Sequence, residues 1–403
     1  MSTLQGLKIK QCPICDSELS GELKSLELGS FDSSLLYKSI ELVCCNVCGH
    51  VYNRLRKEEC DNIIKFYKTE HEELDGGRTH KDVIEKRNSD FYNVLKNYCD
   101  ESSKILDLGC GEGDFLKYLI EKRYTDLSGF DLADSFGDKT GYPYDINIGN
   151  AEILPYENNL FDALVLDQFL EHVINPKKVL QEAFRVTKYG GVAIVGIPNA
   201  KEYNKYNMFP LFFVILREHI QHFDIDHLTM LANDIGFTVK KVVETIFPMQ
   251  AMNMPMANIY VVLKKNKVCK QQAVNKLDLK SEMINYLNIN STKLLLMKEK
   301  ILEYINFGKT IYFWGIGREF FLIYSMLSTE QQRGCRFIDA NKRKQRSQKI
   351  DGIDIIDGSE LAGLKQDNIA VAITAVYHTK VIERYLLDIN FCGDIIKIFE
   401  FKD

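Results

Sequence analysis

Short apolar runs, each followed by a glycine turn or an acidic residue, recur along the central and C-terminal parts of the chain. Ile105, Leu106 and Leu108 form one such run, three glycines follow at alternate positions, and residues 115–120 then have helical spacing. A short run of this kind is typical of a strand buried on both faces. The same order of strand, glycine turn and helix begins again at residue 310. The pattern therefore predicts two doubly wound α/β units.

Further runs extend both units. After the first glycine turn, residues 168–176 are expected to form a helix that follows directly on a strand. Between the two units, residues 264–300 are rich in lysine and then helical in pattern, which indicates a linker and the first helix of another domain. The other segments that have the composition of strands are 127–132, 159–167, 192–199, 235–244, 257–263, 336–339, 370–374 and 395–399.

Length, charge and cysteine content limit the classes of function. A chain of 403 residues is too long for one typical core, so two or three domains are expected. The net charge of −5 gives no general attraction to nucleic acid or to an anionic membrane. The longest apolar run, residues 208–216, contains Pro210 and is too short to span a bilayer. The first residues have no signal-peptide pattern, so we expect a cytoplasmic protein whose eleven cysteines are reduced thiols and metal ligands.

Two Cys-x-x-Cys pairs stand near the start of the chain. Cys12 and Cys15 form the first pair, and Cys45 and Cys48 form the second. Two such pairs suit a tetrahedral thiolate site, so we predict a structural zinc ion in a zinc-ribbon module. Cys44 is an alternative third ligand, although Cys45 keeps the usual spacing. His50 is expected at the surface rather than as a ligand, and a nucleic-acid-binding knuckle remains an alternative without a basic and aromatic cluster to support it.

The first glycine turn reads Asp107-x-Gly109-x-Gly111-x-Gly113. A dinucleotide fingerprint would place its third glycine at position 114, which is Asp114 here, so NAD and FAD are disfavoured. The spacing resembles the first motif of class I S-adenosylmethionine (SAM) methyltransferases. Asp131 ends the next predicted strand, where a carboxylate can accept hydrogen bonds from ribose hydroxyls.

The motifs that follow strengthen this resemblance. They are Leu154-Pro155, Phe161-Asp162, Leu170-Glu171-His172, Arg185-Val-Thr-Lys-Tyr-Gly-Gly191 and Pro198-Asn199. Their order and separations over residues 104–262 are similar to the class I pattern, which implies SAM as cofactor and a final strand inserted antiparallel. Asn150 occupies a position where the family usually has Asp. The implied cofactor-binding residues are Asp107, Gly109, Cys110, Gly111, Gly113, Asp131, Asn150, Ala151 and Asp167.

The order of modules over nearly the whole chain resembles the zinc-containing sugar C-methyltransferases that act on nucleotide-linked deoxysugars. In the C-terminal part the resemblance depends on residues 314–317, 337–341 and 351–356. It implies three domains: a zinc-binding module with a linker (1–75), a Rossmann-like SAM-binding methyltransferase domain (76–263) and a smaller Rossmann-like α/β domain (264–403). The second glycine turn lacks a glycine at Phe320, so no separate dinucleotide site is expected there.

Members of that family remove a proton beside the ketone of an NDP-4-ketosugar and methylate the enolate carbon. Glu218 and His219 match the family's site motif, with the histidine as base, and His172 matches a histidine near the sugar. Leu216 stands where the family has Tyr. Loss of that hydroxyl keeps O- or N-methylation of a sugar open as an alternative, with His219 or His222 as base. The candidate catalytic residues are therefore His219, Glu218, His172 and His222.

The expected partner is a small nucleotide-sugar substrate, with no nucleic acid and no membrane. A non-catalytic protein that binds SAM or another protein remains the alternative of a different class. The oligomeric state is left open between monomer and homodimer.

Overall fold

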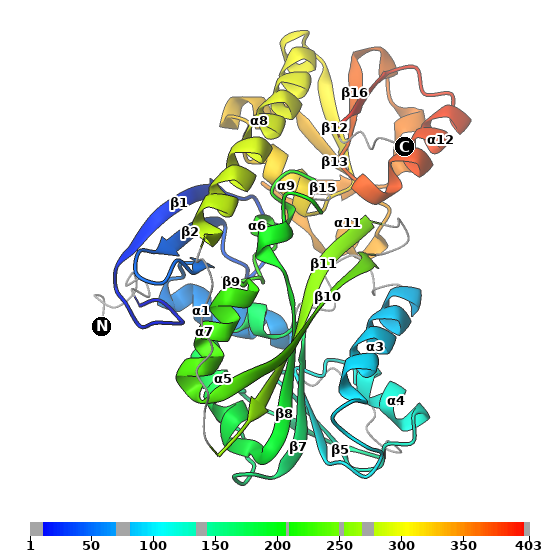
Figure 1. Ribbon diagram of the computed structural model, residues 1–403. Coiled ribbons are helices and arrows are strands. Elements are labelled where there is room, and N and C mark those ends of the chain that lie inside the picture. Colours follow the sequence, from blue (N-terminus) through cyan, green and yellow to red (C-terminus); the bar gives the residue numbers. More distant parts are fainter. Residues whose placement is uncertain are drawn as a thin grey trace, which may run out of the picture.

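The computed structural model describes residues 11–69, 81–133, 143–206, 209–249, 254–267 and 278–398. These ranges contain three β-sheets. In Figure 1 the N-terminal sheet lies at the left, the central sheet at the bottom and the C-terminal sheet at the top. The expected domain boundary between residues 75 and 76 lies outside the described ranges. No helix in the described part of the chain is long and apolar enough to cross a membrane.

The first sheet is antiparallel and takes its last strand from a distant part of the chain. Its order is β1-β2-β3-β9, and Val51 of β3 is paired with His222 of β9. Helix α1 (Lys57–Thr69) follows β3 and buries one apolar face. The strands are β1 (Ser20–Glu27), β2 (Ser39–Cys45), β3 (Val51–Asn53) and β9 (Gln221–His222).

The central sheet has seven strands in the order β10-β11-β8-β7-β4-β5-β6. Only β11 runs antiparallel to its neighbours, as the sequence predicted for the final strand. The strands are β4 (Ile105–Leu108), β5 (Leu127–Asp131), β6 (Asp145–Ile148), β7 (Phe161–Asp167), β8 (Thr187–Pro198), β10 (Phe237–Met249) and β11 (Met254–Lys265).

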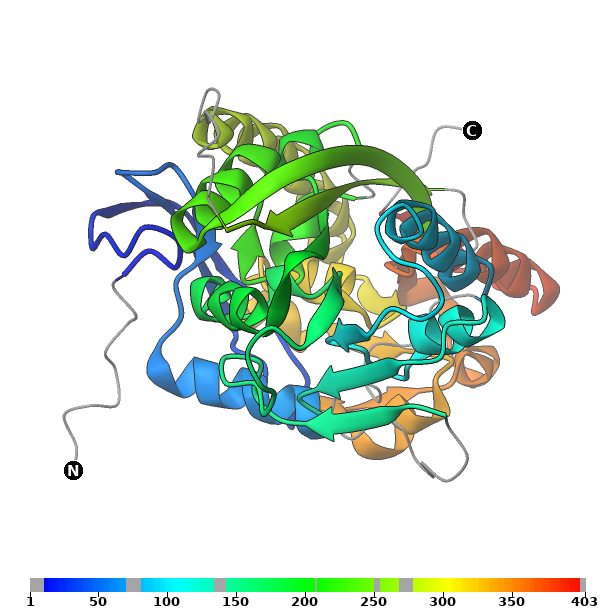
Figure 2. The same ribbon diagram turned by 60° about the horizontal axis from the view of Figure 1, so that its bottom comes forward.

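Helices cover both faces of the central sheet because its strands are apolar on both sides. Figure 2 shows α3 and α4 in cyan on one side and α5 and α7 in green on the other. The helices are α3 (Lys81–Leu95), α4 (Asp114–Glu121), α5 (Pro176–Val186) and α7 (Ile225–Ile235).

The third sheet is the second α/β unit that the sequence predicted. Its order is β14-β15-β13-β12-β16-β17, and all neighbours are parallel except β14 and β15. Helices α8 and α9 pack on one face and α12 on the other. The strands are β12 (Thr310–Trp314), β13 (Cys335–Ile338), β14 (Lys349–Ile350), β15 (Ile353–Ile356), β16 (Ile369–Ile373) and β17 (Asp394–Lys397), and the helices are α8 (Leu279–Asn306), α9 (Arg318–Tyr324), α10 (Thr329–Arg333), α11 (Lys342–Ser347) and α12 (Thr379–Asp388).

One apolar core joins parts of the chain that the sequence assigns to three separate segments. Leu42 of the first sheet, Phe213 of helix α6 (Phe212–Ile215) and Phe313 of the third sheet belong to the same buried cluster. Tyr286 of α8 also belongs to it, and its hydroxyl accepts a hydrogen bond from the main-chain N–H of Phe213. The first and third sheets therefore share one core, while two further clusters line the faces of the central sheet.

Two local expectations were wrong. Residues 168–176 form a single 3₁₀ turn, η1 (Leu170–His172), rather than a helix, because Asn175 caps a new helix that begins at Pro176. His50 is fully buried rather than exposed. Its Nε2 lies 3.0 Å from Oε1 of Gln221, so β9 supplies the polar partner that a buried imidazole requires.

Candidate active site

The first glycine turn lies at the carboxyl end of β4 and has left-handed backbone at Gly109, Gly111 and Gly113. A Cβ atom at Gly109 would lie 2.3 Å from Cδ2 of Phe169, so the loop after β7 packs directly on the start of the turn. A Cβ atom at Gly111 would meet nothing within 4 Å. The turn is therefore closed at its beginning and open at its middle, where a ligand can approach the backbone.

Asp131 lies beside the open part of this turn. Its Oδ2 accepts a hydrogen bond of 2.9 Å from the N–H of Gly111, and its Oδ1 accepts one of 3.0 Å from the N–H of Ala133. Each carboxylate oxygen has a further lone pair. The side chain can therefore hold the turn and still accept ribose hydroxyls.

Three acidic side chains gather behind the turn. Asp107 and Glu171 are buried, and Asp167 at the end of β7 is nearly so. Burial raises the pKa of Asp107 and the pKa of Glu171 to about 8 each, because the charged form loses its hydration. Nε of Arg87 contacts Oδ2 of Asp167 at 2.8 Å. As Asp107 and Glu171 ionise near pH 8, negative charge exceeds that of this cation, and the site then favours a positively charged ligand such as the sulfonium and ammonium groups of SAM.

The remaining predicted cofactor residues lie at the same edge of the sheet but differ in what they offer. Cys110 is buried, and its Sγ lies 2.8 Å from the place of a Cβ atom at Gly129, so its side chain points back into the sheet. Asn150 is exposed after β6, and Ala151 beside it is buried. Asn150 Oδ1 accepts a hydrogen bond from the N–H of Glu152, which holds that loop.

Two histidines meet beside this edge. The rings of His172 in η1 and His219 after α6 are perpendicular, with centroids 4.6 Å apart. Nδ1 of His172 lies 3.1 Å from the main-chain oxygen of Glu218 and 2.8 Å from Oη of Tyr67 in α1. Burial and the neighbouring His172 lower the pKa of His219 well below its usual value. His219 is therefore a neutral imidazole near pH 7 and can accept a proton.

Glu218 is held by the C-terminal unit. Its Oε1 accepts a hydrogen bond of 2.7 Å from Nη2 of Arg318, the first residue of α9. Burial opposes ionisation of Glu218, but the Arg318 guanidinium outweighs it, and the pKa of Glu218 falls to about 2. Glu218 is thus an ionised anchor between two units and a weak proton acceptor.

His222 lies apart from the His172–His219 pair. It is fully buried in β9, and its Nδ1 lies 3.2 Å from Oη of Tyr203. Burial lowers the pKa of His222 to about 3. The surrounding β9 pairing gives this histidine a place in the sheet core.

Sequence reasoning missed three side chains at the site. It assigned no role to Arg318 or to the carboxylate of Glu171, and Tyr67 stands outside the motifs that it recognised. Tyr67 and Arg318 reach the site from 105 and 100 residues away in the chain, so no local pattern shows them. Glu171 was visible as the residue before His172 in a recognised motif.

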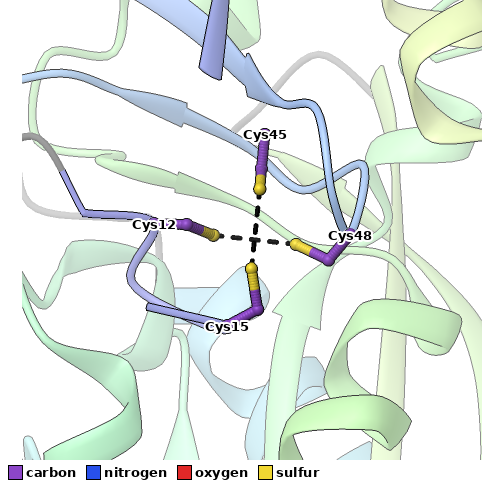
Figure 3. A group of neighbouring side chains, drawn as sticks. All are labelled: Cys12, Cys15, Cys45 and Cys48. Atoms are coloured by element: carbon purple, nitrogen blue, oxygen red, sulfur yellow. Dashed lines mark hydrogen bonds between the residues drawn. The ribbon is translucent and has the colours of Figure 1, made fainter. Parts of the chain in front are cut away.

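The four cysteines of the two Cys-x-x-Cys pairs come together at one point (Figure 3). Sγ of Cys12 lies 3.6 Å from Sγ of Cys48, and Sγ of Cys15 lies 3.5 Å from Sγ of Cys45. A tetrahedral zinc ion with Zn–S bonds of about 2.3 Å requires sulfur pairs about 3.8 Å apart. The donor set and its spacing therefore fit zinc. Cys44 is outside the group, because its thiol faces the main-chain oxygens of Cys45 and Gly49.

The cysteine cluster is tied to the segment that carries His219. Nε2 of His227 lies 2.9 Å from the main-chain oxygen of Cys48, and Nδ1 of His227 lies 2.6 Å from Oδ1 of Asp224. Nδ2 of Asn53 donates a 3.1 Å hydrogen bond to the main-chain oxygen of His219. Displacing the cysteine knuckle would therefore also displace the histidine segment.

The second glycine turn, after β12, has the same aspartate-to-backbone hydrogen bonds as the first, but different side chains surround it. Asp339 accepts hydrogen bonds from the N–H of Ile316 at 2.8 Å and from the N–H of Asn341 at 2.9 Å. Nζ of Lys344 lies 3.0 Å from Asp339 and 2.7 Å from the main-chain oxygen of Ile316. A Cβ atom at Gly315 would lie 2.3 Å from Cβ of Ala375. This turn is packed against protein atoms beside Gly315.

Comparison with known proteins identifies the central unit. Residues 80–242 match a family model described as a methyltransferase domain. The chain is 29% identical over 175 residues to a probable S-adenosylmethionine-dependent methyltransferase of Mycolicibacterium smegmatis, covering 41% of this chain and 66% of the relative. It is 30% identical over 162 residues to a demethylmenaquinone methyltransferase of Paenarthrobacter aurescens, covering 34% of this chain and 62% of the relative.

A solved structure of a SAM-dependent methyltransferase from Methanosarcina mazei aligns with 44% of this chain and 99% of its own length, at 22% identity and a TM-score of 0.36. The chain spans 41%, 66% and 43% of the lengths of three curated relatives that it matches. The similarity covers the central unit, whose α/β fold and match to the methyltransferase-domain model agree.

Proposed function

We propose that this chain, whose central unit is a class I SAM-dependent methyltransferase domain, transfers a methyl group from SAM to a carbon of a nucleotide-linked 4-keto-deoxysugar. The observation that carries the proposal is the neutral imidazole of His219, which packs against the ring of His172 beside the SAM edge of the sheet. The Glu218–Arg318 ion pair supports it, since it joins the histidine segment to the C-terminal unit.

Several residues would hold the cofactor. Asp131 would accept hydrogen bonds from the ribose, and the open turn at Gly111 would admit the backbone approach of the ligand. Asp107 and Asp167 would balance the positive charge of SAM. Bound SAM supplies an electrophilic methyl group.

His219 is the proposed base. It would take the proton from the carbon beside the ketone, and the electron pair of the broken C–H bond would form the enolate. Tyr67 and the Glu218 carbonyl would hold His172 through its Nδ1, and the His172 ring would orient His219 by packing against it.

O-methylation of a sugar hydroxyl is the second candidate. Leu216 is buried where the similar sugar methyltransferases have Tyr, and a leucine cannot donate a hydrogen bond to an enolate oxygen. For O-methylation His219 would deprotonate the hydroxyl instead, and no enolate would form.

The experiment offers methyl-labelled SAM with a panel of nucleotide-sugars, with and without a 4-keto group, and reads the products by mass. Methyl gain on 4-ketosugars, with solvent deuterium entering the carbon beside the ketone, is expected for carbon methylation. Gain on sugars without the ketone supports the second candidate. His219→Asn is expected to lose at least about 100-fold in rate, while the control His378→Asn, at an exposed histidine, keeps it. No gain on any nucleotide-sugar would contradict both candidates.

Structural zinc on Cys12, Cys15, Cys45 and Cys48 belongs to the same proposal. Metal analysis of the purified protein is expected to find one zinc ion per chain, and Cys15→Ser to lose it. Cys44→Ser is the matched control, because its thiol faces main-chain oxygens. Equal zinc content in the two variants would contradict the assignment.

A further inference from the structure

A buried carboxylate and two imidazoles face one another beside η1. One carboxylate oxygen of Glu171, one ring nitrogen of His172 and one ring nitrogen of His219 all lie within 4.8 Å of one another. Nε2 of His172 is 3.8 Å from Oε1 of Glu171. Two imidazoles and a carboxylate are a donor set that first-row divalent metal ions bind in proteins.

Glu171 is short of partners. It is 2% exposed, and neither of its carboxylate oxygens has a hydrogen-bond partner among the described residues. An isolated buried carboxylate is costly, and either a proton or a cation removes the cost. A separation of 3.8 Å is too long for a hydrogen bond between Glu171 and His172. A metal ion about 2.1 Å from each atom would bridge it.

The orientation of His172 favours the cation. Its Nδ1 lies 3.1 Å from the main-chain oxygen of Glu218, which can only accept a hydrogen bond. Nδ1 also lies 2.8 Å from Oη of Tyr67, a hydroxyl that can accept as well as donate. In the tautomer in which Nδ1 donates to these two oxygens, Nε2 keeps its lone pair toward Glu171. Metal-bound histidines have this second contact, which fixes the tautomer and orients the ring.

We propose that Glu171, His172 and His219 form a binding site for a divalent first-row transition-metal ion such as Mn²⁺ or Fe²⁺. Two opposite ligands at about 2.1 Å span about 4.2 Å. A pair of atoms at the 4.8 Å limit of this group would therefore close by about half an ångström on binding. The effect on catalysis rests on the proposed function: the ion and the abstracted proton compete for the lone pair of His219. Filling the site would therefore slow methyl transfer.

The binding test uses the full chain with its cysteine cluster loaded with zinc. Mn²⁺ is titrated and followed by electron paramagnetic resonance, since this ion prefers carboxylate and imidazole over thiolate ligands. One saturable site is expected, and Glu171→Gln should weaken it at least about tenfold. Glu182→Gln is the control, because the Glu182 side chain contacts Arg185 and the N–H of Leu154 instead. Absence of saturable binding, or equal weakening in both variants, would overturn the proposal.

A second measurement distinguishes the loss of a metal ligand from misfolding of the variant. Pulsed resonance of bound Mn²⁺ should show coupling to imidazole nitrogen, and His172→Asn and His219→Asn should each reduce it. Both variants are first checked for an unchanged unfolding midpoint and zinc content. Mn²⁺ bound without nitrogen coupling in the unaltered protein would overturn the site.

The results can reject the proposed metal site and the proposed function independently of each other. Mn²⁺ binding that depends on Glu171, with no methyl transfer to any nucleotide-sugar, would keep the metal site and reject the proposed substrate. Methyl transfer without saturable Mn²⁺ binding would keep the function and reject the metal site. Methyl transfer at full rate with Mn²⁺ bound would keep the metal site but reject His219 as the base.

Discussion

The two glycine turns share a backbone arrangement and differ in how the charge of the acidic side chains around them is neutralised. In both, an aspartate at the end of the neighbouring strand accepts hydrogen bonds from one N–H of the turn and one N–H of its own loop. In the C-terminal turn, Lys344 neutralises Asp339 from within the chain. Around the first turn, Asp107, Asp167 and Glu171 outnumber their cation, Arg87. The first turn therefore gains an excess of negative charge as its buried acids ionise near pH 8, whereas the charge of Asp339 in the C-terminal turn is balanced by Lys344.

The packing around the two turns also differs. Ala375 fills the space beside Gly315, whereas nothing lies within 4 Å of a Cβ position at Gly111. A glycine turn between strand and helix is therefore insufficient evidence for a ligand. The side chains that reach the turn from other elements decide whether it can accept one.

Alanine at the first packed glycine of each turn should give the largest contrast. Gly109→Ala combines a left-handed φ with overlap on Phe169, costing about 3 kcal/mol, or about a 100-fold rise in the Kd for SAM. Gly315→Ala has the same two defects against Ala375. It should lower the free energy of unfolding by about 3 kcal/mol and leave SAM binding unchanged. Calorimetric titration and denaturant unfolding measure the two effects, and a loss of SAM affinity in Gly315→Ala would remove the contrast.

Removing the internal counterion should be the next largest effect. Asp339→Ala leaves Lys344 buried without its carboxylate and should destabilise the fold by about 2–3 kcal/mol. The double variant Asp339→Ala with Lys344→Met removes the orphaned charge and should recover more than half of that loss. Urea unfolding measures both variants. Equal stability of the single and double variants would show that the ion pair does not balance this turn.

The pH dependence of SAM binding should show a smaller effect, which is specific to the first turn. Asp107 and Glu171 have pKa values of about 8, so they ionise as pH rises from 6 to 9 and should then attract the SAM cation more strongly. The Kd for SAM should fall about tenfold over that range. The same groups bind more protons in the folded than in the unfolded state between about pH 4 and 8, so their contribution to stability falls as pH rises there. Asp107→Asn should flatten the binding profile, and an unchanged profile would contradict the assignment.

Alanine at the open position should have the smallest effect. Gly111→Ala meets no neighbour, and only its left-handed φ is unfavourable, by about 1 kcal/mol. The Kd for SAM should rise about fivefold or less. A rise as large as that of Gly109→Ala would mean that the ligand itself occupies the space beside Gly111.

Local patterns predicted most strands of the two α/β units and both glycine turns, because each depends on neighbours in sequence. The antiparallel direction of the final strand was implied by the class I resemblance. They failed at 168–176, where capping by Asn175 starts a separate helix. They also failed at His50, whose burial depends on Gln221 of β9.

The candidate site was only partly predictable for a related reason. His172 and His219 were visible in motifs, but their contact joins segments on separate elements. Arg318 carries no signal of its own, since its role arises only where α9 meets Glu218. Tyr67 likewise acquires its partner from the loop after β7. Periodicity describes which face of an element is apolar, and it does not say which distant element that face meets.

The pairing of β3 with β9 has a consequence for synthesis on the ribosome. Val51 cannot pair until His222 has been synthesised, 171 residues later (222 − 51). At about 5–20 residues per second this interval lasts roughly ten to thirty seconds, during which β3 has an unpaired edge. A nascent chain that stalls between these two points would present that edge to other polypeptides. We therefore expect the yield of folded protein to depend on chaperone supply and on the speed of translation through the central domain.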